Sequence, residues 1–151
     1  MIATKRLTIA PSDTAARAAL RAQWLDGANE RLVGAEPTDQ ELERWLAGTW
    51  AVRERATGDV VGDCTLFFAE EHDAWELAYG FRRDRWGRGY ATEAAGACIR
   101  HGFDELGLAR IVADVDPANI PSVRVLEKLG FERVRDAEGG RMAVYELTRE
   151  R

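Results

Sequence analysis

The hydrophobic pattern of the chain changes its period at Gly89, and this change constrains the fold most. Before it, residues 49–81 contain three apolar runs separated by polar turns, which predicts three antiparallel strands. After it, apolar residues recur at steps of three and four, which predicts an amphipathic helix of about 17 residues that Gly107 closes. A strand, a glycine-rich loop and a long helix therefore form the centre of the predicted fold.

Further elements on both sides of this centre complete one mixed α/β domain over residues 1–151. The order along the chain is β-α-α-β-β-β-α-β-α-β-β, with no internal repeat. Outside the centre, the predicted elements are a strand at 6–10, helices at 13–26 and 38–48, a strand at 110–116, a helix from Pro121 to Gly130, and a final hairpin.

Composition and charge exclude several classes of protein. Hydrophobic residues make up 46% of the chain, which supplies a core, yet no run approaches the roughly 18 residues of a membrane helix. No apolar run of a signal peptide is visible at the start. Cys64 and Cys98 have apolar neighbours and no CxxC spacing, so we expect buried free thiols in a reducing cytoplasm. The net charge of −5 argues against a nucleic-acid-binding face.

The stretch RDRWGRGYATEA, residues 83–94, predicts an anion site. The first N–H groups of a helix lack acceptors within the helix, and the helix dipole adds positive charge there. Gly87 and Gly89 allow a phosphate to approach the backbone, and Thr92 adds a hydroxyl donor. Four arginines can supply charge-assisted bonds to the same anion: Arg82, Arg83, Arg85 and Arg88.

Three kinds of phosphate-binding loop can be compared with this stretch. It lacks the GxxxxGK pattern of the Walker loop, and Thr92 stands where the dinucleotide fingerprint GxGxxG needs its last glycine. It matches the GxG core of the pyrophosphate loop of coenzyme A acyltransferases, although Asp84 replaces the preferred Gln or Arg. A plain helix N-terminus with surface arginines is the alternative.

A second stretch, DPANIPSVRVLEKLGF at 116–131, extends the pattern. Together with YGFRRDRWGRGYATEA it resembles the GNAT N-acetyltransferases, and more narrowly the RimJ/RimL-type branch. The resemblance covers nearly the whole chain, but residues 12–50 match only in outline. It implies a mostly antiparallel sheet of six to seven strands, splayed in the middle, with helices on both faces. It also implies acetyl-CoA as the donor and a primary amine as the acceptor.

The resemblance also implies which residues hold acetyl-CoA. The backbone from Phe81 through Arg82 to Arg83 should bond the pantetheine arm, with an N–H near Phe81 as the candidate oxyanion donor. Asn119 should bond the arm near the sulfur. The pyrophosphate should lie on a loop made of Gly87, Arg88, Gly89, Tyr90, Ala91 and Thr92.

Proton transfer needs at least one further group, because a neutral amine must attack a thioester. Many GNAT enzymes carry a tyrosine acid where this chain has Leu126. Ser122 is the nearest substitute and can bond the sulfur, or it can cap the helix that it begins. Glu76 is the candidate base, directly or through water, with an exposed strand carboxylate as the alternative. Glu93 is expected to be structural, pairing with nearby arginines.

Other polar residues receive smaller roles. Asp114 and Asp116 are weaker candidates for binding a cationic amine. His72 lies in a predicted turn and His101 on the predicted solvent side of the long helix, so neither is assigned to catalysis. No His/Cys cluster has metal-ligand spacing, and no metal is expected.

Three hypotheses for function remain. The first is an amine N-acetyltransferase, acting on a peptide N-terminal α-amine or on a small-molecule amine such as an amino acid, polyamine or aminoglycoside. The second is a coenzyme-A-binding regulatory module without turnover, which the missing tyrosine favours. The third is a nucleotide-binding structural domain. No nucleic acid or membrane partner is expected, and the resemblance is compatible with a homodimer through the terminal strands.

Overall fold

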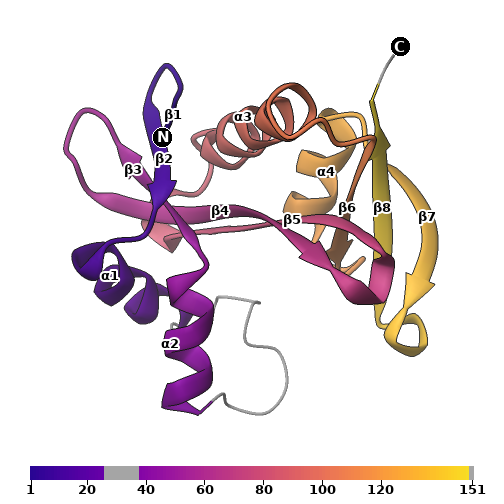
Figure 1. The fold of residues 1–151 in the computed structure, drawn as a ribbon, viewed down its shortest axis with the longest axis horizontal. Coiled ribbons are helices and arrows are strands. Elements are labelled where there is room, and N and C mark those ends of the chain that lie inside the picture. Colours follow the sequence, from indigo (N-terminus) through magenta and orange to yellow (C-terminus); the bar gives the residue numbers. More distant parts are fainter. Residues whose placement is uncertain (26–37, 150–151) are drawn as a thin grey trace. The chain divides into compact units, whose positions relative to one another are not determined.

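The computed structural model describes residues 1–25 and 38–149. The predicted loop at 29–37, and Asp26 at the end of the first predicted helix, lie outside the described residues. The helices (Figure 1) are α1 Thr14–Trp24, α2 Asp39–Ala47, α3 Tyr90–Asp104 and α4 Ile120–Lys128, with 3-10 turns η2 Glu70–His72, η3 Arg83–Arg85 and η4 Glu138–Gly140. The strands are β1 Ile2–Ala3, β2 Leu7–Pro11, β3 Trp50–Glu54, β4 Val60–Ala69, β5 Ala74–Phe81, β6 Arg110–Val115, β7 Glu132–Ala137 and β8 Met142–Thr148.

The strands form a mixed, mostly antiparallel sheet in the order β1-β2-β3-β4-β5-β6-β8-β7. The sequence predicts six to seven strands, and the eighth is β1, which pairs with β2 through Ile2↔Ile9 and Ala3↔Thr8. A strand of two residues is too short to show an alternating pattern, so the sequence does not reveal it. The predicted mixed α/β fold is confirmed.

The chain forms two compact units, and the first contains residues 1–65 and 79–94. Asp13 and Thr38 begin α1 and α2 as N-caps, because each side chain accepts a hydrogen bond from the backbone N–H three residues later. The apolar faces of these helices pack with β3 into one core. Its buried residues are Ala16, Leu20, Trp24, Leu42, Leu46 and Ala51.

The second unit contains residues 66–78 and, within the described chain, 95–149. Six consecutive antiparallel pairs join β6 to β8, and β7 pairs with the other edge of β8. Helix α3 ends at Asp104, slightly before the predicted end, and Leu106 is exposed rather than part of its apolar face. Gly107 follows with a φ of 66°, the left-handed conformation that favours glycine after a helix.

Strands β5 and β6 are parallel neighbours over a short length. Their paired residues are Trp75↔Ile111 and Glu76↔Val112. Within this unit β6 continues to Val115 without a further pair to β5 among the described residues. Glu76 therefore stands at the last pair, where the predicted splay of the sheet begins.

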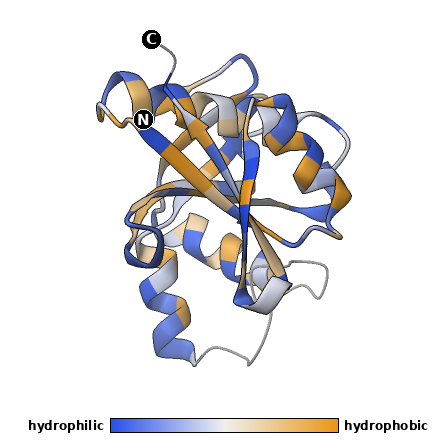
Figure 2. Cartoon of the chain, turned by 90° about the vertical axis from the view of Figure 1, so that its right-hand side faces the viewer, coloured by the Kyte–Doolittle hydropathy of each residue, from blue (hydrophilic) through white to orange (hydrophobic). Residues whose placement is uncertain are grey.

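Figure 2 shows both hydrophobic and hydrophilic residues along the strands and around the helices, and a strand with one buried face alternates between them. The strand β2 shows this period in its burial, because Leu7 and Ile9 are fully buried while their neighbours are not. None of the described helices is long and apolar enough to cross a membrane.

Candidate functional site

The glycine loop of the first unit has an open backbone at the start of α3. Gly87 and Gly89 both have a φ of 79°, a conformation that other residues adopt only with strain. A Cβ atom built at Gly87 would meet nothing within 4 Å. The first hydrogen bond of α3 runs from Glu93 N–H to the Gly89 carbonyl at 3.1 Å, so the N–H groups before Glu93 face the helix entrance. This geometry suits a bulky anion.

The arginines of this loop are largely committed to carboxylates. Arg82 lies 2.7 Å from Asp84, and Arg85 lies 2.9 Å from Asp84 and 3.1 Å from Glu54. Arg88 has a half-exposed side chain and a longer contact of 3.8 Å to Glu54. Asp84, which stands where the pyrophosphate pattern prefers Gln or Arg, therefore neutralises neighbouring arginines. Of these three arginines, Arg88 is the best placed to bind an anion, because its contact with a carboxylate is the longest.

Tyr90 uses its side chain within the protein. Its hydroxyl donates a hydrogen bond of 2.7 Å to Glu54, and the Arg6 guanidinium lies 4.6 Å from the centre of its ring. The bond to Glu54 raises the pKa of Tyr90, and the same bond lowers the pKa of Glu54. Tyr90 can contribute only its backbone to an anion, as can Ala91, whereas Thr92 also carries a hydroxyl.

Glu93 is structural, as the sequence predicts. Its carboxylate accepts bonds from the Arg6 side chain at 2.7 Å, the Arg6 backbone N–H at 2.9 Å and the Thr4 hydroxyl at 2.5 Å. Burial alone would raise the pKa of Glu93, but the bonds from Thr4 and Arg6 outweigh it and hold the pKa below its usual range. Glu93 thus ties the first turn of α3 to the N-terminal segment.

The backbone from Phe81 to Arg83 is partly used by the protein itself. The Arg82 N–H donates to the Val61 carbonyl at 2.8 Å, and the Trp86 indole donates to the Phe81 carbonyl at 2.9 Å. The Arg82 N–H is therefore not available to a ligand. Successive N–H groups of a strand point in opposite directions, so the Phe81 N–H points away from β4. Arg83 has an exposed side chain.

In the second unit, Asn119 and Ser122 meet at the start of α4. The Asn119 side chain is the N-cap: its oxygen accepts from the Ser122 N–H at 3.3 Å, and its amide donates to the Ser122 hydroxyl at 3.1 Å. The cap is thus Asn119 rather than Ser122, because the helix begins at Ile120, one residue before Pro121. The Ser122 hydroxyl remains half-buried and is oriented by that amide.

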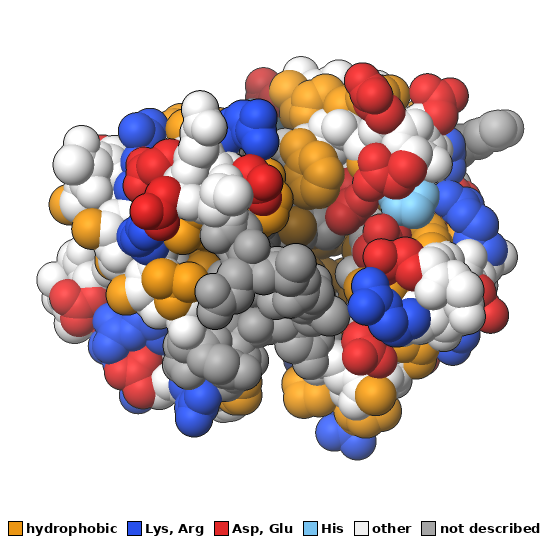
Figure 3. All heavy atoms as spheres, turned by 90° about the horizontal axis from the view of Figure 1, so that it is seen from below, with side chains coloured by type: hydrophobic (Ala, Val, Ile, Leu, Met, Phe, Trp, Pro, Cys, Tyr) orange, Lys and Arg blue, Asp and Glu red, His pale blue; other side chains and the backbone are white. Residues whose placement is uncertain are grey.

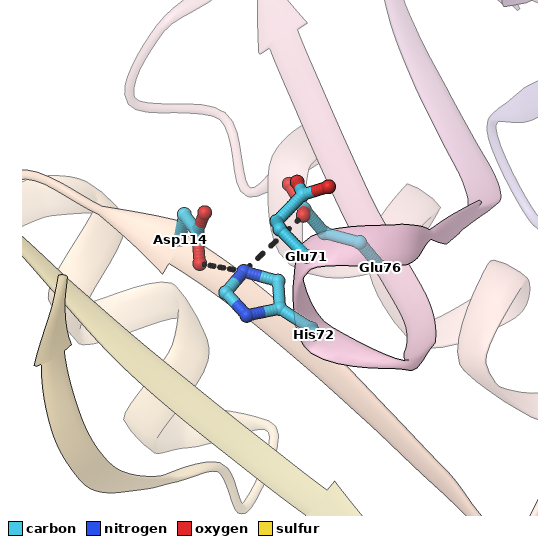
Figure 4. Close-up of side chains that lie close together, drawn as sticks. All are labelled: Glu71, His72, Glu76 and Asp114. Carbon is cyan, nitrogen blue, oxygen red and sulfur yellow. Dashed lines mark ion pairs between the residues drawn. The ribbon is translucent and has the colours of Figure 1, made fainter. Parts of the chain in front are cut away.

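Glu76 belongs to a cluster of polar side chains in the same unit, which we call the acidic cluster: Glu71, His72, Glu76 and Asp114 (Figure 4). Glu76 is only 9% exposed, so it is not the exposed strand carboxylate of the alternative interpretation. The His72 Nε2 atom lies 2.8 Å from Asp114 Oδ1 and 3.7 Å from Glu76 Oε1. Figure 3 shows a histidine with acidic side chains gathered around it.

Sequence reasoning missed the position of His72. Its predicted turn exists as η2, but the side chain is 6% exposed and points into the acidic cluster. Asp114, a candidate for binding a cationic amine, lies in the acidic cluster beside His72. The Asp116 side chain instead accepts a hydrogen bond from the Ala118 N–H in a turn. No local signal identifies the cluster, since Asp114 is separated from His72 by the whole of α3.

The chain is similar to known acetyltransferases. The model of the acetyltransferase (GNAT) domain matches residues 6–132. The chain is 35% identical over 96 residues to the uncharacterized N-acetyltransferase p20 of Bacillus licheniformis, covering 61% of this chain and 54% of that protein. It is 34% identical over 98 residues to the human alpha/beta-tubulin-N-acetyltransferase 9, covering 62% of this chain and 45% of that protein.

Among solved structures, a GNAT-family acetyltransferase from Bacillus anthracis has a TM-score of 0.83 and 24% identity, with 97% of each chain covered. This likeness shows the fold. The chain spans about half the length of the curated relatives it matches.

Proposed function

Because the chain belongs to the acetyltransferase (GNAT) domain family, we propose that it transfers the acetyl group of acetyl-CoA to a primary amine. The observation that carries this proposal is the glycine loop. The family match includes a strand, two glycines of positive φ and the start of a long helix, in that order. Such a helix entrance is suited to a diphosphate.

The open backbone fits the group that the family implies. The N–H groups at Gly89, Tyr90, Ala91 and Thr92, with the side chain of Arg88, would hold the diphosphate of coenzyme A. The Phe81 N–H, which points away from β4, would donate to the thioester carbonyl. When bound, acetyl-CoA supplies an acetyl group activated as a thioester.

The proton steps are assigned to the second unit. Glu76 would accept the proton that the amine loses on attack, directly or through water. The Ser122 hydroxyl, oriented by Asn119, would donate a hydrogen bond to the leaving sulfur. Leu126 replaces the usual tyrosine acid and is 1% exposed, so its side chain belongs to the core and supplies no proton.

The acceptor that we propose is the α-amine of a peptide or protein N-terminus. The RimJ/RimL-type motifs support this class, as does the human relative, whose name gives a protein as its substrate. The acidic cluster is compatible with a cationic amine in general, so small-molecule amines are the alternative.

Release of free coenzyme A thiol from acetyl-CoA tests the proposal. We expect thiol release that depends on added peptides with free N-termini, and less with the same peptides blocked at the N-terminus. Spermidine and free amino acids form the comparison panel. Binding of acetyl-CoA by calorimetry without acceptor-dependent release would instead indicate a regulatory module, and binding of ATP in preference to coenzyme A a nucleotide-binding domain.

A further inference from the structure

We propose that the acidic cluster is a binding site for a divalent transition-metal ion such as Zn²⁺. His72 Nε2, Glu76 and Asp114 would be its ligands, with Glu71 at the exposed side. Imidazole nitrogen and carboxylate oxygen together are ligands that Zn²⁺ accepts. The site lies wholly within the second unit.

The spacing of the ligand atoms suits a single ion. One ligand atom from each of the four residues lies within 4.8 Å of all the others. A tetrahedral Zn²⁺ with bonds of about 2.0–2.1 Å places its ligand atoms about 3.3 Å apart. The observed separations from His72 Nε2, 2.8 Å to Asp114 and 3.7 Å to Glu76, lie on either side of that value. Small side-chain adjustments would complete the geometry.

The burial of the His72 side chain is a second observation that points to a ligand. Its side chain is 94% buried, since 6% is exposed, and Nε2 points into the cluster. Neither Nε2 nor Asp114 Oδ1 makes a hydrogen bond of acceptable alignment, although the two atoms are close. Buried polar atoms normally have a partner, and a metal ion at this point would satisfy both.

Charge in the cluster favours a cation. Three carboxylates gather around one imidazole, so the cluster offers several anionic ligand atoms to a single ion. Within the described chain Asp114 has no arginine or lysine partner. Arg110, the nearby guanidinium, instead contacts Glu146 and the His72 backbone carbonyl. A divalent ion would balance the charge of Asp114, which no arginine of the described chain contacts.

The contact of Arg135 with His72 competes with metal binding, so a variant of Arg135 can test the proposal. Its NH2 atom lies 2.8 Å from His72 Nδ1. In that arrangement Nδ1 accepts a hydrogen bond, so the imidazole proton is on Nε2, the atom that must bind the metal. Metal binding therefore needs the proton to move to Nδ1 and Arg135 to withdraw. Because Arg135 is exposed, it can do so.

A metal here would join η2 and β5 to β6 beside their two-residue pairing. It would also occupy Glu76, the base in the proposed function, so a bound metal should inhibit acetyl transfer. Metal binding is measured without acetyl-CoA and amine, so its outcome is independent of whether the chain is a transferase.

The experiment is titration of the full chain, freed of metal by a chelator, with Co²⁺. We expect one Co²⁺ per chain with the visible absorption of a tetrahedral or five-coordinate site, and displacement by Zn²⁺. The ion should raise the thermal unfolding temperature, because it binds the folded state. Absence of a saturable Co²⁺ signal with the unaltered chain would overturn the proposal. So would a thiolate charge-transfer band, which would assign the ion to Cys64 or Cys98.

Variants then locate the site. His72→Ala and Asp114→Asn should each weaken Co²⁺ binding by at least about tenfold, since even outer-shell partners contribute that much. His101→Ala, which removes the other histidine of the chain, should leave the affinity unchanged. Arg135→Gln should bind more tightly than the parent. Equal losses in the His72 and His101 variants would refute the site, provided that circular dichroism shows both folded.

Discussion

Two buried carboxylates, Glu54 in the first unit and Glu76 in the second, are similarly shielded from water but differ in their surroundings. Glu54 is 6% exposed, and Glu76 is 9% exposed. Glu54 accepts hydrogen bonds from Tyr90, Thr57 and Arg85. Glu76 lies beside His72 in a cluster with two further acids.

This difference in surroundings distinguishes a carboxylate that stabilises the fold, such as Glu54, from one that can take part in chemistry, such as Glu76. A buried carboxylate that is held by a guanidinium and hydroxyls has its charge satisfied, and its pKa is lowered. It has little tendency to take up a proton or bind a cation. A carboxylate beside an imidazole and other acids is the arrangement that chemical sites often use. Four predictions test this distinction, from the largest expected effect to the smallest.

The first prediction concerns Glu76. Glu76→Gln should lower kcat by about 10²- to 10⁴-fold, the usual contribution of general acid–base catalysis, with little change in the affinity for acetyl-CoA. The control is Glu146→Gln, which alters a partly buried carboxylate of the same unit that pairs with Arg110 at 2.8 Å. Steady-state thiol release measures both. An equal loss of kcat in the two variants would contradict the proposed catalytic role of Glu76.

The second prediction concerns the glycine loop of the first unit. Gly87→Trp should weaken coenzyme A binding by about 10- to 100-fold, equivalent to losing one charge-assisted hydrogen bond to the diphosphate. Gly58→Trp is a matched control, because Gly58 has the same φ of 79° and also has nothing within 4 Å of a built Cβ. Calorimetry gives both affinities. If Gly58→Trp weakens coenzyme A binding as much as Gly87→Trp does, the loss comes from backbone strain and not from a blocked diphosphate site at the glycine loop.

The third prediction concerns pH and Glu93, a satisfied carboxylate of the first unit. The pKa of Glu93 in the folded protein lies below the ordinary glutamate value of 4.5, so its contribution to stability is present above about pH 4.5 and is lost as pH falls through the folded pKa. Glu93→Gln should therefore lower the free energy of unfolding by about 1–2 kcal/mol at pH 7, with a smaller difference from the parent near pH 3. Urea unfolding at both pH values measures this, and a constant difference would contradict the pKa direction.

The fourth prediction separates Asn119 from Ser122. Asn119→Ala removes the N-cap of α4 and should lower the thermal unfolding temperature by about 2–4 °C, the equivalent of about 1 kcal/mol. Ser122→Ala should leave that temperature almost unchanged but lower kcat by several-fold, more than it lowers the affinity for acetyl-CoA. Calorimetric scans and thiol release give the two readouts. Unchanged kcat in Ser122→Ala would remove the proposed bond to the sulfur.

Much of the fold follows from local patterns. The helices α2, α3 and α4 were predictable from apolar spacing, capping residues and glycines, and the glycine loop from its composition, because each depends on neighbours in the sequence. The strand β1 could not be predicted, because two residues are too few to show an alternating hydrophobic pattern. Ile2 instead takes its place in the sheet by pairing with Ile9. Ser122 is not the cap of α4, because the helix begins at Ile120, before Pro121, and Asn119 caps it.

Local signals therefore determined the order of elements, the family and the left-handed glycines at the start of α3. The tertiary structure decided which charges meet. Arg85 and Glu54 are 31 residues apart in the sequence, as the hydrogen bond between them records. His72 and Asp114 meet because β5 and β6 pair in parallel, with α3 between them in the chain. Electrostatic interactions depend on distance in space, and chain separation does not encode that distance.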